Sequence, residues 1–140
     1  MIERLNLEKN EVEKLQYIFY AQAFQIMKAT KESLHKFAAE PGNTDSLQTI
    51  KRYIHTLKGD ASIIGLESIG MLCQKMEEVL ALFDVDASSI SKESLTIFTK
   101  CVESVEGTLK AIQAGSESAH VQETIDTIEN FIALHKKIPS

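Results

Sequence analysis

Residues 45–83 read DSLQTIKRYIHTLKGDASIIGLESIGMLCQKMEEVLALF, and this stretch decides the fold. Its apolar side chains recur at steps of three and four on both sides of Gly65, which is the spacing of one face of an α-helix. A glycine between two such runs ends one helix and allows a tight turn into the next. The stretch therefore predicts two antiparallel helices, 45–62 and 66–83, joined at Gly65.

The same apolar spacing continues on both sides of this pair. It predicts three further helices, at 7–39, 92–114 and 117–137. Turn-forming or polar residues separate the helices, most clearly Pro41-Gly42-Asn43 and Gly115. Helices of this length joined by short connections pack as an antiparallel bundle. The sequence has no internal repeat and no long linker, so we expect an all-α fold of five helices in a single domain, residues 1–140.

Composition limits the classes of function. The chain has 140 residues, 44% of them hydrophobic and 25% charged, as in an ordinary globular domain with a core of its own. Its net charge of -5 argues against a nucleic-acid partner, which would call for a basic patch. No apolar run approaches the ~20 residues of a membrane-spanning helix, and residues 1–4 do not resemble the start of a signal peptide. With only Cys73 and Cys101, a disulfide scaffold is not expected, and we predict a cytoplasmic protein.

The run His-Thr-Leu-Lys-Gly at residues 55–59 carries the candidate chemistry. His55 and Lys58 are three residues apart and share a helix face. Each lies one position beyond a residue of the apolar stripe, so both side chains should be partly exposed and supported by the core. Gly59 lies one turn after His55, although glycine inside a helix costs about 1 kcal/mol relative to alanine. Close approach of a second protein's backbone would explain a glycine there.

A simple count places the partners of His55 and Lys58 on the next helix. His55 lies 11 residues before Leu66 and Glu77 lies 11 after it, whereas Lys58 and Gln74 lie 8 before and 8 after. Equal offsets in an antiparallel pair place side chains at equal heights, so His55 should meet Glu77 and Lys58 should lie near Gln74. Glu77 could accept the Nδ1 proton of His55, which leaves Nε2 as a nucleophile. Lys58 could attract an anionic phosphoryl group.

Residues 55–59 together with Gly65 and Glu77 resemble the signature of histidine phosphotransfer (HPt) domains. They are most similar to the N-terminal phosphotransfer domain of CheA-type chemotaxis histidine kinases, and the resemblance covers most of the chain. It implies a bundle with a four-helix HPt core. It also implies that His55 accepts a phosphoryl group from ATP through a kinase catalytic domain and passes it to an aspartate of a receiver domain. Glu77 would orient His55.

The resemblance also directs attention to a face for partner docking. Gly59 matches the glycine of the family signature. Asp60 departs from it, because a small residue is usual there and a carboxylate adds negative charge. Gln74 departs as well, because the CheA type often has a second histidine at that position. Lys51 and Arg52, one turn before His55, fit either a solvated helix face or partner docking.

Two other classes of function compete with this interpretation. A structural or adaptor bundle with an inert His55 would have the same helical pattern. An autonomous enzyme is disfavoured because the sequence has no glycine-rich phosphate loop, so a kinase domain is expected either beyond Ser140 or on a separate protein. No Cys-x-x-Cys or His-x-x-x-His pattern predicts a metal site. We expect no cofactor, with magnesium bound by the receiver or with the ATP of the kinase.

Overall fold

The computed structural model describes residues 8–40, 44–85, 92–115 and 121–136. The described residues form five α-helices and no strand, which confirms the predicted all-α fold class. The helices are α1 (Lys9–Ala39), α2 (Thr44–Ile64), α3 (Glu67–Val85), α4 (Lys92–Gln113) and α5 (Val121–Lys136).

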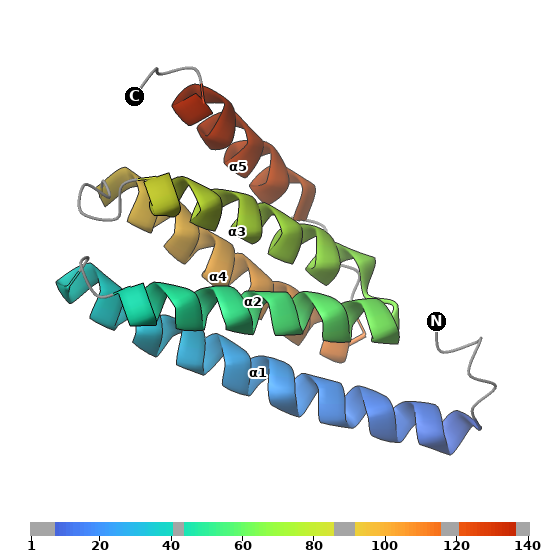
Figure 1. Cartoon of the computed structure of the whole chain (residues 1–140). Coiled ribbons are helices and arrows are strands. Elements are labelled where there is room, and N and C mark those ends of the chain that lie inside the picture. Colours follow the sequence, from blue (N-terminus) through green and yellow to red (C-terminus); the bar gives the residue numbers. More distant parts are fainter. Residues whose placement is uncertain (1–7, 41–43, 86–91, 116–120, 137–140) are drawn as a thin grey trace.

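Four of the helices close around a common core. α1 packs against α2 and α4, and α3 packs against the same two helices, so α1 to α4 form a ring. α5 lies outside this ring, against α3 and α4. Figure 1 shows α1 and α2 side by side and α5 at the edge of the molecule beyond α3. The arrangement is the five-helix bundle that the apolar spacing predicts, with the four-helix core that the family resemblance implies.

One apolar stripe from each helix fills the core. The largest fully buried side chains all come from α1 to α4, and they are Met27, Phe37, Leu47, Ile50, Ile54, Leu57, Ile69, Leu72, Met76, Leu80 and Phe98. Burial of each such side chain contributes roughly 1.5–3 kcal/mol relative to exposure. α2 and α3 supply eight of these eleven residues, so the two helices that carry the candidate site contribute most of the largest buried side chains of the core.

The turn between α2 and α3 fixes how these two helices face each other. Gly65 has φ +88°, a left-handed conformation that favours glycine. The Leu66 amide donates to the Ala61 carbonyl at 2.9 Å, and the Gly65 amide donates to the Ser62 carbonyl at 3.2 Å. These two bonds form a Schellman motif, which satisfies carbonyls at the end of α2 and reverses the chain at once.

The helix ends differ only slightly from those predicted. α2 ends at Ile64 and α3 at Val85, each two residues later than expected. For α2 the reason is the Schellman motif, which closes directly on the last helical turn and leaves no separate loop before Gly65. Predicted helical positions 7, 117–120 and 137 lie outside the described residues. Within the described part of the chain, no helix has the length and apolar character needed to cross a bilayer.

Candidate functional site

His55 lies on the exposed surface of α2, and its neighbours in the helix are anchored in the core. Its side chain is 74% exposed, whereas Ile54 and Leu57 on the same turn are fully buried. The two buried neighbours fix the position of the helix, so the ring of His55 is presented to solvent from a backbone that cannot easily shift. This is the exposed position at the edge of the apolar stripe that the sequence predicts.

The structure brings His55 and Glu77 together across the α2–α3 pair. The Nδ1 atom of His55 lies 3.4 Å from Oε2 of Glu77. The equal-offset count placed the two residues at the same height, and the turn at Gly65 provides that register. A carboxylate facing Nδ1 favours the tautomer in which Nδ1 carries the proton, because the N–H can then donate to the carboxylate. Nε2 then has a free lone pair.

Lys58 contacts both polar residues that α3 presents at this level. Its Nζ donates to Oε1 of Gln74 at 3.2 Å, as the count of offsets predicts. It also lies 2.5 Å from Oε1 of Glu77. Sequence reasoning missed this ion pair. The count of offsets paired each residue of one helix with a single residue at the same height on the other, and it did not consider how far a lysine side chain reaches along the helix. Glu77 thus uses one oxygen for the histidine and the other for the lysine.

This arrangement has a definite electrostatic consequence. The Glu77 carboxylate is 28% exposed and the Lys58 side chain 31%, so both are partly shielded from water beside the much more exposed ring of His55. The Glu77 carboxylate contacts both the ammonium group of Lys58 and the imidazole Nδ1 of His55, so these two groups lie close to each other. A phosphoryl group carried on Nε2 would therefore find a positive charge within one helical turn.

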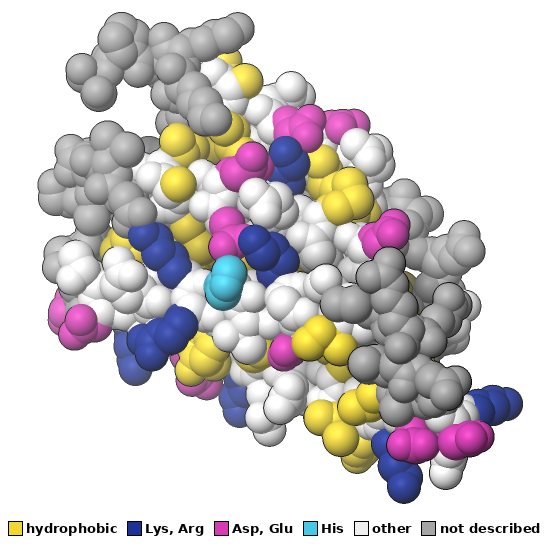
Figure 2. All heavy atoms as spheres, turned by 45° about the vertical axis from the view of Figure 1, so that its right-hand side comes forward, with side chains coloured by type: hydrophobic (Ala, Val, Ile, Leu, Met, Phe, Trp, Pro, Cys, Tyr) yellow, Lys and Arg dark blue, Asp and Glu magenta, His cyan; other side chains and the backbone are white. Residues whose placement is uncertain are grey.

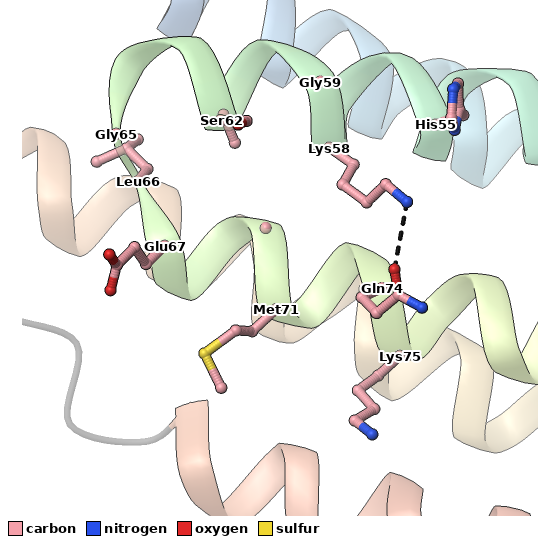
Figure 3. Close-up of a pocket in the computed structure, with 12 residues that line it drawn as sticks. His55, Lys58, Gly59, Ser62, Gly65, Leu66, Glu67, Met71, Gln74 and Lys75 are labelled. Carbon is pink, nitrogen blue, oxygen red and sulfur yellow. Dashed lines mark hydrogen bonds between the residues drawn. The ribbon is translucent and has the colours of Figure 1, made fainter. Parts of the chain in front are cut away.

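A groove of about 830 Å³ runs between α2 and α3 and begins at this cluster. Figure 3 shows the groove with Lys58 reaching across it to Gln74. The side chain of Lys75 points away from α2 in the same view. The lining residues are His55, Lys58, Gly59, Ala61, Ser62, Gly65, Leu66, Glu67, Gly70, Met71, Gln74 and Lys75.

The four residues expected at a docking face are distributed unequally. Gly59 is exposed and lines the groove, and no other part of the chain lies within 4 Å of the position that a Cβ would take there. Arg52 is exposed but lines a different groove, about 610 Å³, between α1 and α2. Lys51 and Asp60 are half-buried and do not line the α2–α3 groove. Figure 2 shows basic side chains close to the exposed histidine on this face.

The buried Cys73 thiol lies close enough to the site to interact with its charges. Burial raises the pKa of Cys73 to about 12, and the negative charge of Glu77 adds to the rise while Lys58 opposes it. The thiol therefore stays protonated at neutral pH and is not a competing nucleophile. Over the described residues, no group of three or more histidine, cysteine or acidic side chains is placed to hold a metal ion.

A family model described as "Hpt domain" matches residues 15–131, which include His55 and all five helices in large part. The chain is a member of the Hpt family. It is therefore a histidine phosphotransfer module.

A solved structure supports the same fold. It is the phosphorylated P1 domain of CheA3 in complex with CheY6 from R. sphaeroides. The two chains are 16% identical, and the similarity covers 86% of this Hpt domain and 97% of the other chain with a TM-score of 0.74. At this identity the likeness concerns the fold. No curated protein matches this Hpt domain in sequence.

Proposed function

We propose that His55 is the phosphoryl carrier of this Hpt domain, taking the group from a CheA-type kinase catalytic domain and giving it to an aspartate of a response-regulator receiver. The observation that carries the proposal is the contact between Nδ1 of His55 and Oε2 of Glu77 at 3.4 Å beneath an exposed ring. The similar P1 domain of CheA3, which is phosphorylated and bound to CheY6, supports a receiver as the acceptor.

The geometry supports the chemistry step by step. Nε2 of neutral His55 attacks the γ-phosphorus of ATP, a P–N bond forms, and the P–O bond to ADP breaks. The ring keeps its Nδ1 proton and becomes positively charged, so the carboxylate of Glu77 stabilises it. In the second step a carboxylate oxygen of the receiver attacks phosphorus, the P–N bond breaks, and Nε2 recovers its lone pair.

Lys58 takes part through charge in this proposal. Its ammonium lies between Glu77 and Gln74, within one helical turn of His55, where it can offset the negative charge of the bound phosphoryl group. Gln74 holds the lysine at that level. The sequence contains no glycine-rich phosphate loop, so the domain acts as a phosphoryl carrier. The ATP site belongs to a kinase domain, either in the same polypeptide or in a separate protein. The proposed place of this transfer is the cytoplasm.

The test is transfer of labelled phosphate from ATP by a CheA-type kinase core supplied in trans. Wild type, His55→Gln and His35→Gln are compared, since His35 is an exposed histidine on α1 away from Glu77. We expect acid-labile label on wild type and on His35→Gln, and none on His55→Gln. If His55→Gln carried as much label as wild type, His55 would not be the phosphorylated histidine. No label on any variant with a panel of kinase cores would favour an inert bundle.

A further inference from the structure

The side of α2 that faces α1 carries a second groove, which the proposed function does not use. Its volume is about 610 Å³. Amide and hydroxyl side chains form most of its walls, among them Gln22 and Gln25 of α1 and Thr49 and Tyr53 of α2. Arg52 is the one charged residue among the described residues that line it. The groove is therefore polar, and the charge on its wall is positive.

Arg52 is a cation without a partner in the described part of the chain. Its side chain is exposed, and the ion pairs formed among the described residues do not include it. Lys58, one turn after His55, is already bound to Glu77 and Gln74. Arg52 lies three residues before His55, so the two side chains share a face of α2. It is therefore free to bind an anion that approaches the ring.

The α1–α2 groove leads to His55 from the side away from Glu77. Thr56, the next residue after His55, lines this groove, and Arg52 lines it one turn earlier. No described residue lines both this groove and the α2–α3 groove. α2 contacts α1 on one side and α3 on the other, as Figure 1 shows. A partner in the α1–α2 groove therefore reaches the exposed ring without entering the α2–α3 groove.

Uptake of the phosphoryl group from ATP brings more negative charge to His55 than the later transfer does. In uptake, the P–N bond to Nε2 forms while the bond between the γ-phosphorus and the bridging oxygen breaks, and ADP keeps that electron pair. The attacking and leaving atoms lie roughly in line, so the equatorial oxygens point sideways. An arginine one helical turn away can bind such oxygens through its planar guanidinium. After ADP has left, only the phosphoryl group remains for it to bind.

The net charge of -5 repels an ATP-bearing partner from most of the surface, whereas the α1–α2 groove presents a positive group. We propose that this groove is the docking surface for the kinase catalytic domain, and that Arg52 binds the triphosphate of the ATP that this domain carries. The inference rests on the proposed function for its choice of partner. Polar side chains of the kinase domain contact Gln22, Gln25 and Thr49, and the γ-phosphorus lies beside Nε2 of His55. Arg52 therefore acts on uptake from the kinase more than on transfer to a receiver.

The test compares Arg52→Gln and Gln25→Glu with the control Lys110→Gln, and His55→Gln serves as the blank. The first three variants make the net charge more negative by one, and Lys110 is exposed on α4 and lines neither groove. Each altered side chain is exposed, so the fold should be retained. Uptake is measured as kcat/KM with labelled ATP and the CheA-type kinase core that phosphorylates wild type fastest. Transfer is measured after phosphorylation by phosphoramidate, a small donor, as the rate of phosphohistidine loss to the receiver domain that accepts from wild type fastest.

We expect Arg52→Gln to lower kcat/KM with the kinase core at least tenfold, and its loss in the rate of transfer to the receiver to be at least five times smaller. Gln25→Glu should lower kcat/KM at least threefold, because it places a negative charge in the groove. Lys110→Gln should stay within twofold of wild type in both steps. Higher ionic strength should reduce the difference between wild type and Arg52→Gln, because salt screens an exposed charge.

Uptake by Arg52→Gln within twofold of wild type, or equal losses in uptake and transfer, would overturn the inference. A loss in Arg52→Gln without any loss in Gln25→Glu would overturn the groove as the docking surface. In each of these cases, label on wild type and none on His55→Gln would leave the proposed function standing. The expected losses together with full label on His55→Gln would refute the proposed function alone.

Discussion

At the scale of single residues, Glu77 is the group on which the site depends. Its two oxygens contact different partners, Oε2 at 3.4 Å from Nδ1 of His55 and Oε1 at 2.5 Å from Nζ of Lys58. Its negative charge therefore acts on the tautomer of the histidine and on the position of the lysine together. A residue that serves both partners should be more sensitive to substitution than either contact alone suggests.

Replacement Glu77→Gln tests this directly. The amide has nearly the same size but no charge, and hydrogen bonds to charged groups contribute about 1.5–3 kcal/mol, so we expect the rate of phosphoryl uptake to fall roughly 10- to 100-fold. Nitrogen NMR of the His55 ring should show a mixture of tautomers where the wild type shows the Nδ1–H form. The matched control is Glu78→Gln, the next residue of α3, whose carboxylate pairs with Lys75 at 3.2 Å. Equal rates for wild type and Glu77→Gln would remove Glu77 from the mechanism.

At the scale of elements, the α2–α3 hairpin sets the geometry of the site through one turn. The turn depends on the left-handed φ of +88° at Gly65 and on the two hydrogen bonds that close α2. A residue with a Cβ costs roughly 1–2 kcal/mol in that conformation. Any adjustment of the turn would change the relative heights of His55 and Glu77.

We therefore predict that Gly65→Ala lowers the free energy of unfolding by about 1–2 kcal/mol and slows phosphoryl uptake in the folded protein. The control is Gly107→Ala in the middle of α4, which should raise stability by up to about 1 kcal/mol because alanine favours a helix. Urea denaturation followed by circular dichroism measures the stability of both variants, and transfer of labelled phosphate measures the rate of phosphoryl uptake. A Gly65→Ala protein as stable as wild type would contradict the role assigned to the turn.

The sequence predicts the parts of this fold that are local. Apolar spacing of three and four residues defines each helix, and Gly65 with equal offsets brings His55 to Glu77, because both depend on short stretches of chain. The ion pair of Lys58 with Glu77 was missed, since a long flexible side chain can reach a neighbour one turn away from its expected height. The attachment of α5 to α3, partly through Lys75 and Glu129 at 3.0 Å, depends on packing between distant segments that periodicity does not determine.

Gly70 is a second feature whose surroundings could not be predicted from the sequence. In the sequence it is one glycine in a helical run, and nothing in the spacing distinguishes a glycine that packs against a neighbour from one that faces open space. Only the surroundings of the position decide, and they show no neighbour within 4 Å. A similar uncertainty applied to Arg52, which lies near His55 in sequence but lines the groove on the α1 side.

At the scale of the whole molecule, the core carries two thiols whose ionisation opposes folding at high pH. Burial raises the pKa of Cys73 and of Cys101 from 9.0 to about 12. In the unfolded chain both thiols lose their protons near pH 9, whereas the folded protein keeps them. The contribution of the two protonated thiols to the free energy of unfolding is therefore fully present below pH 9. It is lost progressively as the pH rises toward 12.

This loss has a predictable slope. Each thiol should lower the free energy of unfolding by up to about 1.4 kcal/mol per pH unit between pH 9 and 12. The double variant Cys73→Ala/Cys101→Ala should be less stable at pH 7.5, because two core atoms are removed, yet its stability should fall less steeply with pH. Tyr20 and Lys75, whose pKa values are raised by burial and by the hydrogen bond to Glu129 respectively, leave a residual slope in both proteins. Urea denaturation at pH 7.5, 9.5 and 10.5 measures the two slopes. Parallel slopes would show that the thiols are not the groups that link alkaline pH to unfolding.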